Sequence, residues 1–304
     1  MKKIAIVGTG AIGGYYGGLL ARSGLDIHFL LRNDFEVAQA KGLIIRRERE
    51  ELVIPIQAYC QPADIGACDL VIIALKSTAN NILPELLQPL VRDYTMLLTL
   101  QNGLGNVELL QKLYPSNHIV GGLCFVCINR VAPATYENYF PGYVEMGESR
   151  GPPTSRLQQI IDWFQQAGSN CSIVDPLQEA LWRKLCWNIP FNGLAIAAGG
   201  ITTDKILADP ILVDRAWNLM REIQAASPHP IPDEFLQLQF ENTRPMGPYQ
   251  PSSLIDFLAG RNVEIDAIWG NPLREGQRYK ILMPELEKLW GELKTACCGS
   301  DIPA

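Results

Sequence analysis

Apolar residues in the first half of the chain gather in short runs separated by amphipathic stretches. The runs Lys3–Val7, Asp69–Leu75 and Met96–Leu100 are nearly all apolar, which is typical of parallel strands covered on both faces. Further strands are expected at Asp26–Leu31 and Ile119–Ile128, with helices at Ala11–Ser23, Asn80–Val91 and Asn106–Leu113. This alternation predicts an α/β domain at residues 1–174, built as a Rossmann-type doubly wound sheet.

Residues 134–146 predict a hairpin added to this sheet. Tyr- and Phe-rich segments flank Pro141-Gly142, a dipeptide that is typical of a turn. We therefore expect two short strands joined at this point.

From residue 175 onward the pattern is helical. Helix starts, with an N-cap residue followed by proline, are predicted at Asp175-Pro176, Asp209-Pro210 and Asn271-Pro272. The proline-rich segment 227–232 predicts a connection between helices. We therefore expect an all-α C-terminal domain at residues 175–304.

A glycine motif lies between the first predicted strand and the first predicted helix. It reads Gly8-Thr9-Gly10-Ala11-Ile12-Gly13, and this strand–loop–helix context is the one in which GxGxxG binds a dinucleotide. Gly8 would allow the tight turn, Gly10 the approach of a pyrophosphate and Gly13 close packing of the helix. The alternative is a glycine-rich turn without a nucleotide, and the context favours the nucleotide site.

The end of the second predicted strand bears on the choice between NAD and NADP. An NAD site usually has an acidic residue about 20 residues after the glycine loop. This chain has Arg32 instead, in the sequence LLRN, and a guanidinium can hold a 2′-phosphate through two hydrogen bonds. We predict NADPH as the cofactor; a solvated loop arginine is the alternative.

Two more polar residues follow predicted strands at the carboxyl ends, where open α/β sheets bind ligands. Lys76 is placed to meet a phosphate, and Asn102 offers both an amide donor and an acceptor beside Gly103. A solvated lysine and a turn asparagine are the structural alternatives.

The apolar segment LWRKLCWNIPFN at residues 181–192 contains Lys184, Asn188 and Asn192 at intervals of four. On a continuous helix these residues would form one polar stripe. A lysine in an apolar setting is suited to act as a general acid, so we predict that Lys184 protonates a carbonyl oxygen while the asparagines orient the substrate. The alternative is a lysine that reaches solvent beside capping asparagines. Pro190 predicts a kink, which leaves the direction of Asn192 open.

Charge and cysteine usage exclude several other functions. The net charge of −6 argues against a nucleic-acid-binding surface. No apolar run approaches the roughly 18 residues of a membrane span, and the N-terminal run is too short for a signal peptide, so we expect a cytoplasmic protein without membrane partners. Cys124 and Cys127 form a CxxC within a predicted strand, and the three histidines match no metal-ligand spacing, so no metal is expected.

Together these motifs resemble the ketopantoate reductases (2-dehydropantoate 2-reductases) over about residues 1–270. The segments that carry the resemblance are GTGAIG, LKS, QNGLGN, ALWRKLCWNIPFN and SSLIDFLAGRNVEID, in this order. The resemblance implies reduction of 2-dehydropantoate to pantoate with NADPH, a step toward pantothenate and coenzyme A.

The resemblance also implies roles for particular residues. Gly8–Gly13 would hold the pyrophosphate, Arg32 and Lys76 would lie near the 2′-phosphate, and Lys184 would donate the proton. Cofactor or substrate contacts are implied for Asn102, Asn188, Asn192, Ser252 and Glu264. From the residues alone, Ser252 and Ser253 are equally well explained as a helix start, and Glu264 as a charge near a helix N-terminus.

One departure from the family pattern concerns the substrate. Trp269 stands where many members have asparagine, which leaves open a different 2-oxo or hydroxy acid. A non-catalytic NADP(H) sensor is a further alternative, against which the set Lys184, Asn188 and Glu264 argues. The Trp- and Leu-rich helical half could also bury a homodimer interface.

Overall fold

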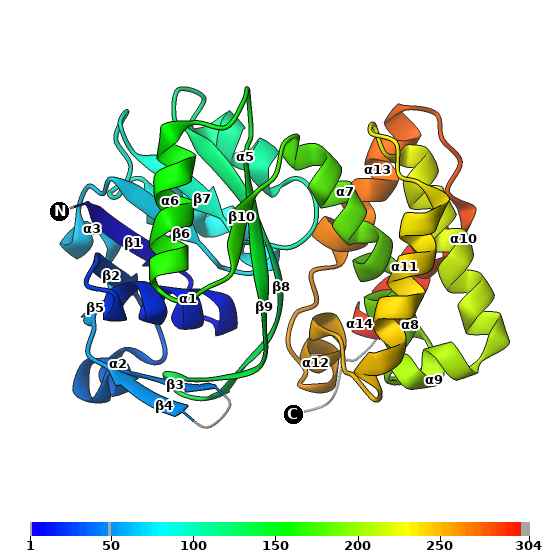
Figure 1. Cartoon of the computed structure of the whole chain (residues 1–304), viewed down its shortest axis with the longest axis horizontal. Helices are drawn as coiled ribbons and strands as arrows, with labels where there is room; N and C mark the ends of the chain where they lie inside the picture. Colours follow the sequence, from blue (N-terminus) through cyan, green and yellow to red (C-terminus); the bar gives the residue numbers. More distant parts are fainter. Residues whose placement is uncertain (1, 48–49, 299–304) are drawn as a thin grey trace. The chain divides into compact units, whose positions relative to one another are not determined.

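The structure is a computed structural model that describes residues 2–47 and 50–298. The chain forms two compact units (Figure 1). Unit 1 comprises Met1–Gln101 and Asn106–Leu177, and unit 2 comprises Asn102–Gly105 and Gln178–Ala304. The short segment Asn102–Gly105 is thus assigned to unit 2, although its neighbours on both sides in the chain belong to unit 1.

Unit 1 contains a mixed sheet with strand order β4-β3-β9-β8-β7-β6-β1-β2-β5, and β10 pairs with β9. Strands β6, β1 and β2 are neighbouring parallel strands. The strands are β1 (Lys3–Val7), β2 (Asp26–Leu30), β3 (Leu43–Arg47), β4 (Glu50–Ile54), β5 (Gln57–Tyr59), β6 (Leu70–Ile73), β7 (Met96–Thr99), β8 (Ile119–Ala132), β9 (Thr135–Glu148) and β10 (Cys171–Ile173). The predicted α/β class of the N-terminal half is confirmed.

The helices of unit 1 connect these strands. They are α1 (Ala11–Arg22), α2 (Phe35–Lys41), α3 (Pro62–Ile65), the 3₁₀ helix η1 (Ser77–Ile82), α4 (Leu83–Leu87), α5 (Asn106–Leu113) and α6 (Ser155–Gln166). Helices α1 and α6 lie side by side, with the rings of Tyr16 and Phe164 5.5 Å apart (Figure 1). Both rings are buried in the core of unit 1, and this packing holds α1 in place. The N-terminus of α1 follows the glycine loop.

One helix of unit 1 is shorter than predicted. The segment expected as a helix at Asn80–Val91 divides into η1 and α4, and α4 ends at Leu87. Gln88 still has a helical backbone conformation, but Pro89 has no backbone N–H to donate the next helical hydrogen bond, which explains the early end.

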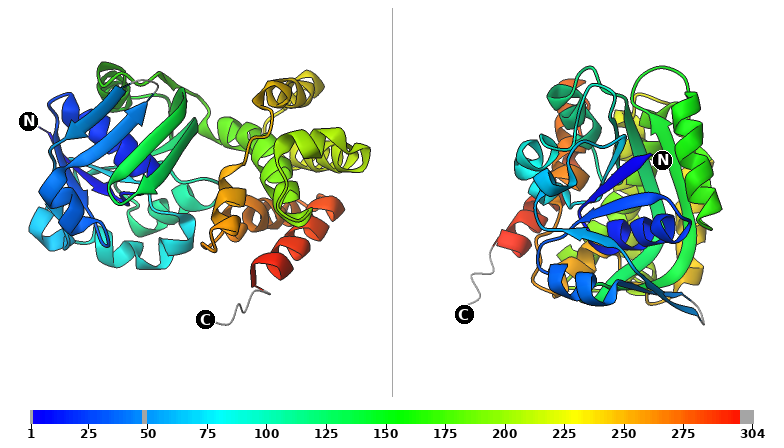
Figure 2. Two further views of the ribbon diagram at one scale, coloured as in Figure 1. Left: turned by 90° about the horizontal axis from the view of Figure 1, so that it is seen from below. Right: turned by 90° about the vertical axis from the view of Figure 1, so that its left-hand side faces the viewer.

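The predicted hairpin at residues 134–146 is wrong. Residues 135–146 belong to the single strand β9, which pairs antiparallel with β8 in the long ribbon drawn in green in Figures 1 and 2. The chain reverses instead at Pro133-Ala134. Pro141-Gly142 lies at an irregularity in the pairing, where Gly142 has a φ of 54°. A bulge in a strand uses the same residue types as a turn, so the dipeptide misled the prediction.

Unit 2 is helical, and residues 178–298 contain no strand. Its elements are α7 (Leu177–Trp187), the π-helical turn η2 (Asn188–Asn192), α8 (Gly193–Ala197), α9 (Thr203–Ala208), α10 (Pro210–Ala226), α11 (Asp233–Thr243), the 3₁₀ helix η3 (Arg244–Met246), α12 (Ser252–Leu258), the π-helical turn η4 (Asp266–Gly270), α13 (Asn271–Arg278) and α14 (Pro284–Cys298). The predicted all-α character of the C-terminal half is confirmed.

The predicted helix starts differ in their accuracy. The Asp209 side chain accepts hydrogen bonds from the backbone N–H groups of Ile211 and Leu212, so it caps α10 as expected. Helix α7 begins at Leu177, after a cis peptide bond between Asp175 and Pro176, so Pro176 is not its first residue. The helical path that contains Asn271 already begins in η4, and α13 continues it.

Candidate functional site

The glycine loop joins β1 to α1 and is held at both sides. The Thr9 hydroxyl donates a hydrogen bond to the carbonyl oxygen of Leu30, at the end of β2, over 3.0 Å. The Tyr136 hydroxyl on β9 donates to the carbonyl oxygen of Thr9 over 3.1 Å. These two bonds fix the loop backbone between three strands of unit 1.

The three motif glycines serve different purposes. Gly8 has a φ of +100°, and a Cβ atom built there would lie 2.4 Å from the backbone nitrogen of Leu75. A Cβ atom on Gly13 would lie 2.1 Å from the carbonyl oxygen of Gly8. In contrast, a Cβ atom on Gly10 would meet nothing within 4 Å. Gly8 and Gly13 are therefore required by the fold, whereas Gly10 keeps the surface beside the helix N-terminus open.

The N-terminus of α1 is suited to an anion. No side chain caps it, and its first turn contains no acidic residue. Its leading N–H groups and the positive end of the helix dipole are therefore not neutralised by a side chain of the first turn. Together with the open space at Gly10, this arrangement fits the pyrophosphate of a dinucleotide.

Arg32 and Lys76 follow the carboxyl ends of β2 and β6, on either side of the glycine loop. Because β6, β1 and β2 are adjacent and parallel, the three following segments lie along one edge of the sheet. Both basic side chains belong to exposed residues. The structure therefore brings the predicted phosphate ligands to the same edge as the glycine loop.

An acidic residue near Arg32 is engaged elsewhere. Asp34 is 5% exposed, and its Oδ2 accepts hydrogen bonds from Arg130 Nη1 and from the backbone N–H of Ala134, each over 3.0 Å. Sequence reasoning did not identify this pairing, because Arg130 is nearly 100 residues away along the chain. The carboxylate next to the β2 end thus stabilises the β8–β9 turn.

The predicted proton donor contacts another predicted site residue. Lys184 Nζ donates a hydrogen bond to Asn102 Oδ1 over 3.0 Å, and both residues belong to unit 2. Lys184 is half-buried near the end of α7. Two residues selected independently, 82 positions apart, therefore form one polar pair.

The loop that carries Asn102 is fixed to unit 2 by further bonds. The N–H of Leu104 donates to the carbonyl oxygen of Ala267 over 2.9 Å, and Asn271 Nδ2 donates to the carbonyl oxygen of Leu104 over 2.6 Å. A Cβ atom on Gly103 would lie 2.2 Å from the Ala267 oxygen. The close approach of these two backbones explains why glycine follows Asn102.

The predicted polar stripe is interrupted after Lys184. Helix α7 ends at Trp187, and residues Asn188–Asn192 form the π turn η2 around Pro190. Asn192 is 2% exposed, and its Oδ1 accepts a hydrogen bond from the backbone N–H of Ser253 over 2.9 Å. The interval of four therefore does not produce a single stripe, because the π turn changes the direction in which the later asparagine points.

The second predicted cluster lies around the start of α12. Ser252 is exposed, whereas Ser253 is buried. Glu264 is also buried, with 8% of its surface exposed, and lies just before η4. Its carbonyl oxygen accepts a hydrogen bond from the backbone N–H of Ile268 in that turn. Of the two serines, only Ser252 presents its side chain to the surface.

Trp269 is a core residue of unit 2, where its side chain is 0% exposed. The sequence left open that this tryptophan admits a different substrate, but its side chain is packed among other core residues. Its effect on a substrate would therefore have to be indirect.

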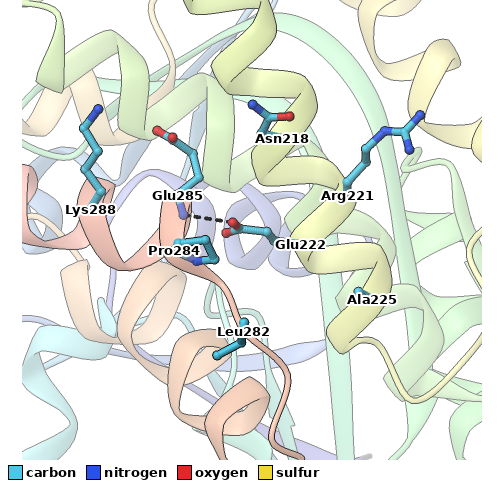
Figure 3. Close-up of a pocket in the computed structure, with 8 residues that line it drawn as sticks. All are labelled: Asn218, Arg221, Glu222, Ala225, Leu282, Pro284, Glu285 and Lys288. Carbon is cyan, nitrogen blue, oxygen red and sulfur yellow. Dashed lines mark hydrogen bonds between the residues drawn. The ribbon is translucent and has the colours of Figure 1, made fainter.

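Unit 2 also has a hollow away from these residues. It has a volume of about 520 Å³ and is lined by residues of α10, by Leu282 and by the first turns of α14 (Figure 3). Glu222 accepts hydrogen bonds there from the N–H groups of Glu285 and Leu286, each over 2.8 Å, and burial raises the pKa of its carboxyl. No predicted site residue lines this hollow, and a carboxylate already satisfies the leading N–H groups of α14.

Within the described residues 2–47 and 50–298, no group of three or more His, Cys, Asp or Glu side chains is arranged to hold a metal ion. No helix of this part of the chain combines the length and apolar character that a membrane crossing requires.

A glycine loop on a Rossmann-type sheet, followed by a helical unit with a lysine–asparagine pair, defines an oxidoreductase of the nicotinamide-dependent class. The family model described as "Ketopantoate reductase PanE/ApbA" matches residues 4–151, and its C-terminal counterpart matches residues 176–296. The chain belongs to the ketopantoate reductase family.

Individual relatives agree with this assignment. A 2-dehydropantoate 2-reductase of Nostoc sp. is 39% identical over 302 residues, covering 96% of this chain and 94% of the relative. The crystal structure of 2-dehydropantoate 2-reductase from Geobacter metallireducens has a TM-score of 0.93 at 40% identity, covering 97% of this chain and 99% of that chain. The fold is also that of a D-mandelate dehydrogenase solved with NADH and anilino(oxo)acetate, with a TM-score of 0.90, 21% identity and coverage of 98% and 99%.

Proposed function

We propose that this chain reduces 2-dehydropantoate to pantoate with NADPH, a step toward pantothenate and coenzyme A. The observation that carries the proposal is the 3.0 Å hydrogen bond from Lys184 Nζ to Asn102 Oδ1. The substrate is taken from the relatives of this name, which match the chain over nearly its whole length.

Residues 1–174 hold most of the cofactor in this proposal. The loop Gly8–Gly13 and the uncapped start of α1 bind the pyrophosphate, and Arg32 and Lys76 bind the 2′-phosphate. Asn102 and Glu264 contribute further cofactor contacts. When bound, NADPH supplies the hydride that reduces the carbonyl carbon.

Residues 175–304 bind the substrate and supply the proton. When the carbonyl carbon is reduced, its oxygen gains negative charge, and the Lys184 ammonium gives it a proton to complete the hydroxyl group. Asn102 Oδ1 accepts a hydrogen bond from one of the ammonium N–H groups, and this bond fixes the direction of Nζ. Asn188, Asn192 and Ser252 bind the hydroxyl and carboxylate of the substrate.

Substitution of the lysine tests the proton-transfer role. Lys184→Ala should lower kcat by about 100-fold to about 10,000-fold, the range for loss of a general acid. The Kd for NADPH, measured by fluorescence titration, should stay near the wild-type value. Lys205→Ala is the matched control, because Lys205 is an exposed lysine on α9 of the same unit. Full activity in Lys184→Ala would refute the role of the lysine.

A substrate panel tests the reaction itself. The absorbance of NADPH, and separately of NADH, is followed with 2-dehydropantoate and with other 2-oxo acids. Preference for another acid would favour the alternative reductase, and binding of NADPH without its oxidation would favour a sensor. Light scattering on the same sample tests whether the chain forms a homodimer.

A further inference from the structure

Asn80 joins the two ends of the loop that carries Asn102. This loop, Asn102–Gly105, leaves unit 1 after Gln101 and returns to it at Asn106. Gln101 Nε2 donates to Asn80 Oδ1 over 2.8 Å, and Asn80 Nδ2 donates to Asn106 Oδ1 over 2.9 Å. One carboxamide therefore bonds to the residue before the loop and to the residue after it.

The partners of Asn80 are buried and fixed. Gln101 is 7% exposed and Asn106 is 3% exposed. The Thr99 hydroxyl donates to Gln101 Oε1 over 3.0 Å, and Thr99 lies at the end of β7. The two bonds of Asn80 are partly buried, so each contributes more to order than a fully exposed bond does.

The loop itself has little intrinsic rigidity. Two of its four residues are Gly103 and Gly105, with φ values of +84° and +92°, and glycine has the greatest backbone freedom in an unconstrained chain. A loop of this composition needs external bonds to hold a single conformation. Asn80 supplies such bonds at both ends from η1, the segment that directly follows Lys76.

We propose that Asn80 is a positioning residue for catalysis, acting through the Asn102 loop to hold the Asn102 amide oxygen against Lys184. The inference rests on the proposed function, because it assigns a kinetic consequence to the Lys184–Asn102 contact. Asn80 itself does not touch the reacting atoms in this proposal; it holds the base of the loop while Asn102 orients the ammonium.

Asn80→Ala removes both bonds and is expected to lower kcat about tenfold to about 100-fold, as small misplacements of catalytic groups do. Asn117→Ala is the matched control. Asn117 also makes two amide hydrogen bonds in unit 1, to the carbonyl oxygens of Arg92 and Thr95, at the opposite end of β7. The variant Asn117→Ala should lose about as much stability as Asn80→Ala while keeping wild-type kcat.

A double-mutant cycle separates positioning from a general loss of structure. If Asn80 acts through Asn102, the variant Asn80→Ala/Asn102→Ala should be no slower than Asn102→Ala alone. Multiplying effects would overturn the proposal, because they would show that Asn80 acts independently of Asn102. Wild-type kcat in Asn80→Ala beside a strongly impaired Asn102→Ala would also overturn it, while leaving the proposed function intact.

A conservative variant covers the case in which Asn80→Ala does not fold. Asn80→Asp keeps an acceptor for Gln101 Nε2 and loses the donor to Asn106, so its kcat should lie between those of the wild type and Asn102→Ala. Wild-type kcat in this variant would refute the need for both bonds. If Asn102→Ala and Lys184→Ala are both fully active, the proposed function itself fails.

Discussion

The indole Nε1 of Trp269 donates a hydrogen bond to the carbonyl oxygen of Ile189 over 3.0 Å, and both residues are 0% exposed. The bond joins the two π turns of unit 2, since Trp269 lies in η4 and Ile189 in η2. A π turn is rare and needs support from its surroundings. Trp269 provides this support directly behind the turn that follows Lys184.

Trp269→Phe is therefore expected to lower the free energy of unfolding by about 1–3 kcal/mol, because a buried carbonyl oxygen loses a donor. Urea denaturation measures the change. Trp290→Phe is the control: among the described residues, the buried Trp290 Nε1 has no hydrogen-bond partner, so its removal should cost less. Equal losses in the two variants would contradict a contribution from the Trp269 bond.

Gly10→Ala should separate cofactor binding from folding. A Cβ atom at Gly10 meets no protein atom within 4 Å, so the unfolding free energy should hardly change. The methyl group would occupy the approach to the α1 N-terminus, and we expect the Kd for NADPH to rise about tenfold or more. Isothermal titration measures it.

Gly291→Ala serves as the control for this substitution. Its Cβ atom also meets nothing within 4 Å, but it lies on α14. It should keep wild-type NADPH affinity and gain up to about 1 kcal/mol from helix propensity. Unchanged binding in Gly10→Ala would argue against a pyrophosphate at this position.

Arg32→Ala tests the choice between NADPH and NADH. Loss of a charged hydrogen-bonding group costs about 1.5–3 kcal/mol, so the Kd for NADPH should rise about tenfold to about 100-fold while that for NADH stays constant. Arg46→Ala is the control, since Arg46 is an exposed arginine of the same unit bonded to Glu51. An equal loss of affinity for both cofactors would rule out recognition of the 2′-phosphate.

Asp26 should contribute a pH-dependent part of the stability. Its pKa is lowered, chiefly by the hydrogen bond from Gln57 Nε2 over 2.8 Å, with a further contribution from His28. A carboxyl whose folded pKa lies below its unfolded value of about 3.9 stabilises the protein above that value and loses this effect as the pH falls through the folded pKa.

Asp26→Asn should therefore be less stable than the wild type at neutral pH, and the difference should shrink toward about pH 3. Urea midpoints measured at a series of pH values test this expectation. A constant difference over the whole range would mean that ionisation of Asp26 does not contribute.

Much of the fold followed from the sequence because its signals are local. β1 and α5 have their predicted bounds, since a nearly all-apolar run or a short amphipathic segment is decided by its own residues. The β8–β9 ribbon was misread at Pro141-Gly142, because a bulge is defined by the facing strand, Phe125 in particular, and not by the dipeptide.

The candidate site was predictable to the extent that its residues are unusual in their setting. Lys184 stands out in an apolar segment, and Asn102 follows an apolar strand, so each could be selected alone. Asn80 has no such contrast: it lies in the polar stretch STANN, and its importance depends on two partners that only the folded chain brings to it. Arg130 and Asp34 escaped the prediction for the same reason.

The π turn η2 gives the segment between α7 and α8 one residue more than an α-helix needs. A π turn closes i→i+5 hydrogen bonds, whereas an α-helix closes i→i+4 hydrogen bonds. Deletion of Pro190, which has no backbone N–H, would remove the extra residue and let α7 continue into α8 with little rotation, so Gly193 would keep its place against Trp269 and Leu289. Deletion of Ile189 or Phe191 would instead leave Pro190 inside the shortened turn and should be far more disruptive.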